Sequence, residues 1–414
     1  FANATIEGGI KKVNNVKGIF GYNGAGKTAL IASVDLYRNL VLDPTYLLQN
    51  DTARKLDKLL NYSLGFFSFS IIFEYKKNVV LKHSIKIEKH PANRGYFISC
   101  EEISLSNGRT FDGRYKVLIR KDDDRLSITD DKKIFNGSAD YLLDAELNYT
   151  SVVSKVMSKL PLSTDSANRT YSDGERVILD LYSNVRNIYA YLSNDDNHAS
   201  YFQNRNPLIE TPIDIGSGNL DSLTCIDVYA NDAVIPKPLL SQYETLNSRL
   251  ERFIKIFKPE LQRIVLDKLE DGQVYHVRKI FKYERYNVEF EFESSGIKQL
   301  VKLFSYLSKC ADGAVVFVDE IDTNINTAYF SKLIAFFKKY GKGQLIFTSH
   351  NVEAMNTLKD QRRSIVALGE NNNLDVWVGK GNKSPVRDYL DGFFPNSPMN
   401  IEDFDFVNVF FGTD

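Results

Sequence analysis

Three glycines and a lysine–threonine pair near the start of the chain have the spacing of a phosphate-binding loop. The segment from Gly21 to Thr28 fits the pattern Gly-x-x-x-x-Gly-Lys-Thr, in which a tight turn points successive backbone N–H groups at phosphate oxygens. In this chemistry Lys27 reaches the β- and γ-phosphates of a nucleotide, and the Thr28 hydroxyl is a ligand of Mg²⁺. The residues expected to bind the nucleotide are Gly21, Asn23, Gly24, Ala25, Gly26, Lys27 and Thr28. The alternative is an ordinary glycine-rich turn, and for Asn23 a purely structural role.

Asp319 and Glu320 supply the second half of this chemistry, far along the chain. They follow an apolar run over residues 314–318, which is typical of a strand buried in the centre of a parallel sheet. The end of such a strand would bring Asp319 to Mg²⁺ and Glu320 to the attacking water as its general base. A strand that ends in a solvated acidic turn is the alternative, and the glycine loop argues against it. Together the two motifs predict a site for ATP and Mg²⁺.

The elements around both motifs are those that this chemistry requires. Residues 17–20 read as a buried strand and residues 29–40 as a helix, so the glycine loop lies between them. Near the acids, apolar periodicity predicts helices over 297–309 and 328–339 and a strand over 344–348. Further strands are expected over residues 274–281, 287–292, 365–368 and 374–377.

Between the two motifs the pattern changes twice. Residues 66–129 contain strand-like runs separated by turn signals, which predict an antiparallel sheet. Residues 140–269 read as mostly helical, with a loop over 193–232 and a new helix at Pro259. Six apolar residues with alternating steps of four and three predict a helix that packs on its own domain or on another subunit. This heptad seam comprises Leu239, Tyr243, Leu246, Leu250, Phe253 and Phe257.

The helical region begins with a capping signal. Ser172 and Glu175 have the spacing of a capping box, so a helix is predicted to start there. The apolar positions that follow at helical spacing are Val177, Leu181, Val185, Ile188 and Leu192.

The sequence thus predicts an α/β fold with a mixed central sheet, an antiparallel β subdomain and a helical insertion. Residues 1–139 would form an ATPase lobe with the glycine loop and the β subdomain, and residues 140–272 the insertion. Residues 273–414 would form a second ATPase lobe, which carries the acids. Both lobes must contribute to one sheet, because the two motifs have to meet around one nucleotide.

Composition and charge argue against several classes of protein. The chain has 52 lysines and arginines against 53 aspartates and glutamates, so its overall charge predicts neither nucleic-acid nor membrane binding. A local basic cluster, expected to be a solvated surface or a nucleic-acid contact, comprises Lys76, Lys77, Lys82, Lys86, Lys89 and Arg94. The three cysteines are far apart, which favours neither a zinc site nor a disulfide framework. No apolar run is long enough to span a membrane, and a cytoplasmic location is expected.

In the order of its motifs the sequence resembles the ABC-type ATPases, including the SMC and RecF-like groups. Ser294, Ser295 and Gly296 match the signature motif of that family, although it has glycine where this chain has Ser295. Asp322 matches its acidic loop and His350 its switch histidine, which belongs to the catalytic site. The resemblance implies that the signature contacts ATP bound by a second copy, so that two copies enclose the nucleotide. The alternatives are ordinary helix capping for the serines and a buried core histidine at position 350.

The compact size and short insertion resemble the ABC-type ATPases of bacterial anti-phage defence. The greatest resemblance in form is to the ATPase component, AriA, of PARIS-type systems, followed by the Septu-type ATPases. This resemblance implies a homo-oligomeric, ATP-dependent sensor or scaffold that holds a nuclease-type effector and releases it when a phage protein is detected. A DNA-maintenance ATPase of the RecF or SMC type is the main alternative. A transporter subunit, which would need a membrane partner, is the least favoured alternative.

Overall fold

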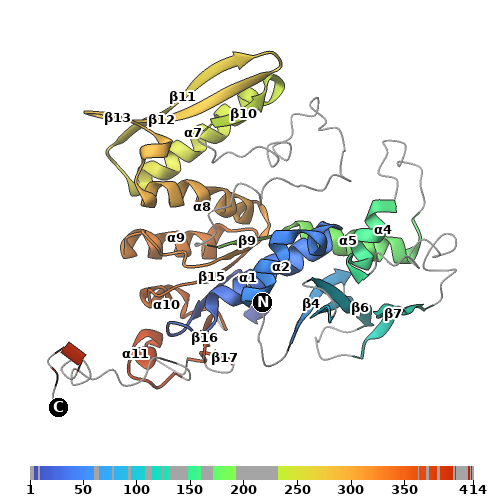
Figure 1. The fold of residues 1–414 in the computed structure, drawn as a ribbon. Coiled ribbons are helices and arrows are strands. Elements are labelled where there is room, and N and C mark those ends of the chain that lie inside the picture. Colours follow the sequence, from blue (N-terminus) through green and yellow to red (C-terminus); the bar gives the residue numbers. More distant parts are fainter. Residues whose placement is uncertain are drawn as a thin grey trace. The chain divides into compact units, whose positions relative to one another are not determined.

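The computed structural model describes residues 4–7, 10–59, 65–76, 79–91, 95–107, 114–123, 125–129, 148–159, 171–192, 232–361, 363–369, 373–379, 383–394, 397, 409–410 and 412. The chain divides into two compact units (Figure 1). The first unit comprises residues 1–32, 189–204 and 213–414, and the second comprises residues 33–188 and 205–212. Both motifs that predict nucleotide chemistry lie in the first unit.

The first unit is built on a six-stranded sheet with the strand before the glycine loop near its centre. Its strands are β3 (Val16–Phe20), β9 (Ile188–Tyr191), β14 (Val315–Val318), β15 (Gln344–Thr348), β16 (Ile365–Leu368) and β17 (Leu374–Val376). Their order across the sheet is β17-β16-β3-β15-β14-β9. β3 is parallel to β15 and β16, β14 is parallel to β15, and β17 is antiparallel to β16. The predicted mixed sheet is therefore confirmed, and β15 lies between the strands that carry the two motifs.

Helices pack on this sheet and complete its hydrophobic core (Figure 1). They are α8 (Ser295–Asp312), α9 (Thr327–Tyr340), α10 (Glu353–Leu358) and α11 (Pro385–Leu390). The first turns of α1 (Lys27–Leu42), which follows the glycine loop, also belong to this unit. α9 and α10 contact β3 and each other, and α8 contacts β14. Phe330 of α9 and Phe347 of β15 are fully buried, with ring centroids 5.7 Å apart. This packing fixes the carboxyl ends of β3 and β14, where ligands bind in open α/β sheets.

A smaller antiparallel sheet packs against the helix that carries the heptad seam. The sheet consists of β10 (Asp232–Pro236), β12 (Val274–Tyr283) and β11 (Leu261–Asp271) in this order, and β13 (Asn287–Glu289) also pairs with β12. The helix is α7 (Leu240–Phe257). Tyr243 and Leu250 of the seam are fully buried. Phe253 packs on Phe304 of α8, with ring centroids 5.2 Å apart. The seam therefore packs within its own unit, as the first of the two interpretations predicts.

Two predictions for the middle of the chain are wrong. The helix expected at Pro259 is replaced by β11, which pairs with β12 through a two-residue hairpin turn. Gly272 in this turn has a φ of 54°, a left-handed conformation that favours glycine. The helix expected to continue past Ile188 ends at Arg186, because Ile188 begins β9 at the edge of the main sheet. The described part of the segment 140–272 thus contains three strands as well as helices, and the three-part division of the chain stays a prediction.

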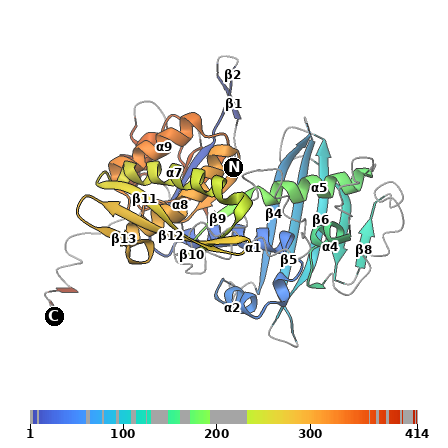
Figure 2. The same ribbon diagram turned by 90° about the horizontal axis from the view of Figure 1, so that it is seen from above.

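The second unit contains the predicted antiparallel sheet. β4 (Phe66–Lys76), β5 (Val79–Lys89), β6 (Tyr96–Asn107), β7 (Lys116–Asp122) and β8 (Arg125–Ile128) lie in sequence order across it (Figure 2). The later turns of α1 share a hydrophobic core with this sheet and with α2 (Asn50–Leu59), α4 (Val152–Lys159) and α5 (Asp173–Arg186). Ser172 and Glu175 form the predicted capping box at the start of α5. Apart from Asp232, the loop expected over 193–232 lies outside the described residues.

The basic cluster of the second unit is partly neutralised by carboxylates. Lys86 pairs with Glu88 at 2.5 Å, and Lys89 pairs with Asp57 at 2.8 Å. The members outside the described residues are Lys77 and Arg94. These ion pairs favour a solvated surface over a nucleic-acid contact. Within the described part of the chain, no helix combines the length and the apolarity needed to cross a membrane.

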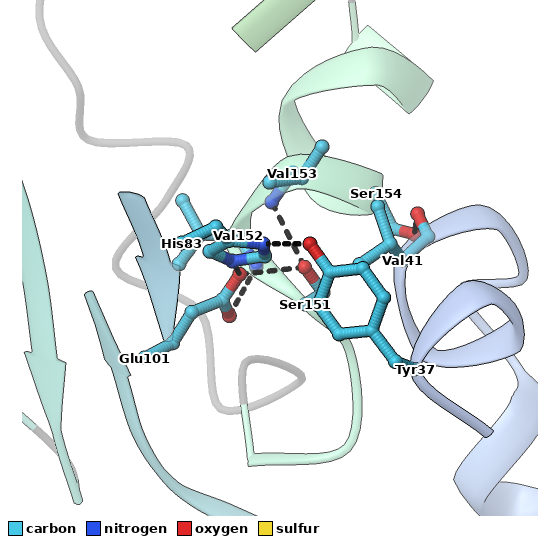
Figure 3. Close-up of polar contacts among 8 residues, drawn as sticks. All are labelled: Tyr37, Val41, His83, Glu101, Ser151, Val152, Val153 and Ser154. Carbon is cyan, nitrogen blue, oxygen red and sulfur yellow. Dashed lines mark hydrogen bonds and ion pairs between the residues drawn. The ribbon is translucent and has the colours of Figure 1, made fainter. Parts of the chain in front are cut away.

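A buried polar network joins α1 to the sheet and to α4 inside the second unit (Figure 3). Glu101 accepts hydrogen bonds from His83 Nε2 (3.0 Å), from the Ser151 hydroxyl (2.6 Å) and from the Val152 N–H (2.8 Å). The Tyr37 hydroxyl bonds to His83 Nδ1 at 2.7 Å, and burial raises the pKa of Tyr37 well above its ordinary value. The side chains of the network are at most 1% exposed. Because buried polar groups need partners, the network both satisfies these groups and fixes α1 to the sheet.

Candidate nucleotide-binding site

The glycine loop forms a compact turn between β3 and α1. Gly24 and Gly26 have φ values of 84° and 93°, which glycine adopts without a steric penalty. Lys27 is buried, and its Nζ donates hydrogen bonds to the carbonyl oxygens of Gly21 (2.8 Å) and Tyr22 (3.0 Å). The ammonium group is therefore held inside the turn, at the N-terminus of α1, where backbone N–H groups and the helix dipole favour an anion.

Three carboxyl groups beyond the end of β14 act electrostatically on Lys27. Burial lowers the pKa of Lys27, and the charges of Asp319, Glu320 and Asp322 oppose this shift. The acids follow β14, and the lysine follows β3, two strands away in the same sheet. The two motifs, which come from opposite ends of the sequence, thus lie together at one edge of the sheet.

Asp319 is fully buried and has one unused oxygen. Its Oδ1 accepts a hydrogen bond from the Thr348 hydroxyl at 2.6 Å, whereas its Oδ2 is buried without a hydrogen-bond partner. Burial raises the pKa of Asp319, and the hydroxyls of Thr348 and Thr28 and the charge of Lys27 oppose the rise. A buried carboxylate oxygen without a partner is costly unless it binds a cation. Oxygen ligands of this kind, from Asp319 and Thr28, fit Mg²⁺.

Glu320 adopts a backbone conformation that is rare for residues other than glycine. Its φ of 48° lies in the left-handed region. Its N–H donates a hydrogen bond to Thr348 Oγ1 (2.8 Å), and its half-buried carboxylate lies 3.5 Å from the Thr323 hydroxyl. Strained residues of this kind cluster at functional sites. The turn places Glu320 directly after Asp319, where a base for the attacking water is required.

The acidic loop after β14 contacts the helix that carries the predicted signature. Asp322 Oδ1 is buried without a hydrogen-bond partner. Asn324 has a φ of 61°, and its Nδ2 donates to Gln299 Oε1 of α8 at 2.8 Å. A Cβ atom at Gly296 would lie 3.3 Å from Asn324 Cβ, so glycine allows the loop and the helix to approach closely. The two segments are thus held together within one chain.

The predicted signature serines and the switch histidine lie on exposed ends of their elements. Ser294 is the N-cap of α8, and its hydroxyl accepts from the Ile297 N–H at 3.4 Å. Ser295 is exposed, and so is His350, which means that the core-histidine alternative is wrong. Among the residues that the structure describes, no hydrogen bond or ion pair joins these three side chains to the glycine loop or to Asp319. Their contact with the nucleotide of a second copy stays a prediction.

Two residues near the site were missed by the sequence analysis. Thr348 contacts both acids, and a hydroxyl residue at the end of the strand expected beside them is the signal that could have identified it. Tyr389 of α11 is buried, which raises its pKa to about 12, and a hydrogen bond with the backbone of Gly21 opposes this rise. No motif marks Tyr389, because it reaches the glycine loop only through tertiary packing.

Comparison with known proteins identifies one family whose model matches most of the sequence. The family model described as "AAA domain, putative AbiEii toxin, Type IV TA system" matches residues 18–356, a range that contains both motifs. No curated protein matches the sequence. One similar solved structure is titled "Crystal structure of the SmcHead bound to the C-winged helix domain of ScpA". It shares 13% identity and a TM-score of 0.40, over 90% of this chain and 94% of the other.

Proposed function

Because the chain belongs to this family of AAA domains, we propose that its first unit binds ATP with Mg²⁺ and hydrolyses it. The observation that carries the proposal is the convergence of the Lys27 ammonium with the carboxyl groups of Asp319, Glu320 and Asp322. One end of the chain supplies the cation that binds phosphate, and the other supplies the acids that a metal ion and a water molecule require. A glycine turn with only a structural role would not need carboxyl groups nearby. An acidic turn with only a structural role would not need a lysine nearby.

Each residue has a role that its surroundings support. The N–H groups of the glycine loop and Lys27 bind the phosphates. Thr28 and Asp319 hold Mg²⁺, since Asp319 Oδ2 is buried without a partner and the Thr28 hydroxyl lies close enough to affect the Asp319 pKa. When bound, the metal ion neutralises charge on the phosphate groups. Glu320 orients or deprotonates the attacking water.

The signature residues serve the nucleotide of a second copy in this proposal. Ser294 and Ser295 are exposed at the N-terminus of α8, an 18-residue helix whose free N–H groups and dipole suit a phosphate. In the same proposal Gly296 and Asp322 act with these serines, and His350 completes the catalytic site. This assignment follows from the resemblance to ABC-type ATPases, and it predicts that ATP promotes a dimer or a larger homo-oligomer.

Two substitutions with matched controls test the proposed site. Lys27→Ala should abolish binding of a fluorescent ATP analogue, whereas Lys332→Ala, on the exposed face of α9, should bind as the wild-type protein does. Glu320→Gln should bind ATP, lose turnover by about 10²-fold or more, and accumulate as an ATP-bound oligomer in size-exclusion chromatography. Glu353→Gln, an exposed carboxylate of α10, should keep normal turnover.

The outcomes separate the two roles. ATP binding by Lys27→Ala at wild-type affinity would overturn the assigned site. Turnover by Glu320→Gln at the wild-type rate would remove Glu320 from the role of base.

The proposed biological role is that of an ATP-dependent sensor or scaffold in anti-phage defence, of the kind formed by AriA in PARIS-type systems. The family description, which names a toxin of a type IV toxin–antitoxin system, supports a place among defence proteins. The protein would act in the cytoplasm, hold a nuclease-type effector and release it when a phage protein appears. A stable complex with the product of a neighbouring gene would support this role. ATP turnover stimulated by DNA alone would favour a DNA-maintenance ATPase instead.

A further inference from the structure

Thr348, the last residue of β15, contacts three successive residues at the end of the neighbouring strand. Its hydroxyl donates a hydrogen bond to Asp319 Oδ1 (2.6 Å) and accepts one from the Glu320 N–H (2.8 Å). Its carbonyl oxygen accepts a third bond from the Ile321 N–H (3.1 Å). Thr348 has no exposed surface, so bulk water does not compete for these bonds. One buried residue thus holds the first three residues of the turn that follows β14.

The chemistry of the three groups determines the direction of each hydrogen bond. An N–H group can only donate, so the Thr348 oxygen must accept from Glu320. A carboxylate can only accept, so the single hydroxyl proton of Thr348 must go to Asp319. The hydroxyl therefore has one favoured orientation, in which it occupies Asp319 Oδ1. The other oxygen, Oδ2, stays without a hydrogen bond and is the one available to a cation.

The same hydroxyl supports the strained backbone at Glu320. A left-handed φ of 48° at this residue is disfavoured by contacts of its Cβ atom, so surrounding bonds must hold it. Two of those bonds go to Thr348, one from Glu320 itself and one from Ile321. The identity of residue 348 therefore affects the metal ligand and the base together.

We infer that Thr348 is a positioning residue of the ATPase site, which orients Asp319 for Mg²⁺ and holds the turn that presents Glu320. The inference rests on the proposed function and adds to it a residue from a third strand. β15 lies between β3 and β14, and Thr348 pairs in register with Ile19 of β3. The strand that leads to His350 is thus linked both to the acids and to the strand of the glycine loop.

Three variants of Thr348 and one control separate positioning from simple packing. Thr348→Val replaces the hydroxyl with a methyl group and keeps the shape of the side chain. Thr348→Ala removes both the hydroxyl and the methyl group. Thr348→Ser keeps the hydroxyl. Ser364→Ala is the control, because Ser364 is also fully buried and its hydroxyl contacts Gln361 at the amino end of β16, away from the acids.

The measurements are turnover against Mg²⁺ concentration, binding of Mn²⁺ with a non-hydrolysable ATP analogue by electron paramagnetic resonance, and binding of fluorescent ATP in EDTA. Loss of a residue that orients a metal ligand typically weakens metal affinity or activity about 10- to 100-fold. We expect Thr348→Val and Thr348→Ala to raise the Mg²⁺ midpoint and the Mn²⁺ dissociation constant by about that factor and to lower kcat at least about tenfold. Binding in EDTA, which depends on Lys27, should change less than about twofold, since the phosphate cradle is intact.

The Thr348→Ser variant decides between positioning by the hydroxyl and simple packing. Thr348→Ser should restore both metal affinity and kcat to within about threefold of the wild-type values, because the hydroxyl is present. A Thr348→Ser variant as impaired as Thr348→Val would overturn the inference, since packing would then be the cause. Thermal unfolding establishes which variants fold, and the comparison of Thr348→Ala with Thr348→Ser decides the matter if Thr348→Val does not.

Failure of the inference is distinguishable from failure of the proposed function. A wild-type protein that hydrolyses ATP, with Thr348→Val and Thr348→Ala showing the same Mg²⁺ midpoint and kcat, would overturn only the role of Thr348. A wild-type protein that binds no ATP would overturn the proposed function and this inference with it.

Discussion

Replacement of Glu101 by alanine should strongly destabilise the second unit. The change removes the acceptor of three buried donors, which are His83 Nε2, the Ser151 hydroxyl and the Val152 N–H (Figure 3). A buried donor without a partner costs about 1–3 kcal/mol, and loss of one member of a buried pair costs about 3–5 kcal/mol in total. Domains have only about 5–15 kcal/mol of stability, so we expect Glu101→Ala to remove a large part of it, about 3–5 kcal/mol.

A second variant and a control separate charge from shape. Glu101→Gln keeps the volume and one acceptor oxygen. In either orientation of the amide, however, the NH₂ group faces a buried donor, so we expect the stability to fall by about 1–3 kcal/mol. Glu102→Ala is the control, because Glu102 lies next to Glu101 on β6 and pairs with half-exposed Arg120 at 3.3 Å. Its loss should leave the buried network unchanged.

Hydrogen exchange followed by mass spectrometry measures this effect, because it resolves β5, β6 and α4 from the rest of the protein. A loss of 3–5 kcal/mol corresponds to exchange that is about 10²- to 10⁴-fold faster in these elements. Fluorescence of Trp377, the single tryptophan of the chain, reports on the first unit in the same sample. Exchange in Glu101→Ala within about fivefold of the wild-type rate would refute the reasoning, since that factor is only about 1 kcal/mol.

Three further predictions concern the nucleotide site. Gly21→Ala should weaken binding of fluorescent ATP by more than about tenfold, because a Cβ atom would lie 2.4 Å from the Leu368 carbonyl oxygen and displace the loop. Tyr389→Phe should weaken the same binding about two- to tenfold, which corresponds to the loss of one hydrogen bond to Gly21. Removal of divalent cations with EDTA should stop phosphate release, and added Mg²⁺ should restore it. Unchanged affinity in Gly21→Ala, or turnover in EDTA, would contradict the assigned site.

Local sequence patterns were sufficient for much of the fold. β15 has the predicted bounds, because a short apolar run between polar residues is typical of a buried strand in an α/β protein. The capping box at Ser172 and Glu175 was predicted for a similar reason, because both partners lie within one turn. The antiparallel sheet of the second unit followed from its turn signals.

Other features depend on contacts that a local pattern does not contain. β11 has apolar residues at spacings that a helix also allows, and only the Asp271–Gly272 turn signal distinguishes a hairpin. His83 and Glu101 are buried because α1 and α4 bring them partners, and nothing on β5 or β6 indicates this.

At the nucleotide site, the motifs indicated which residue types carry the chemistry but not what holds them. Thr348 meets Asp319 through the pairing of β14 with β15, and Asn324 meets Gln299 through the packing of a loop on α8. Both contacts join segments that are separate in the sequence. Prediction of such supporting residues therefore requires the strand order and not only the motifs.

The place of β3 in the main sheet affects how the protein can assemble during translation. Both neighbours of β3 are strands from late in the chain, so the ribosome releases them long after β3 itself. The sheet and helices of the second unit come from a largely continuous stretch, residues 33–188, and can fold while synthesis continues. Until β15 and β16 emerge, β3 exposes two unpaired edges to which other chains can add. A nascent chain would therefore need protection at this strand. A truncated product that lacks the late strands should aggregate and should not bind ATP.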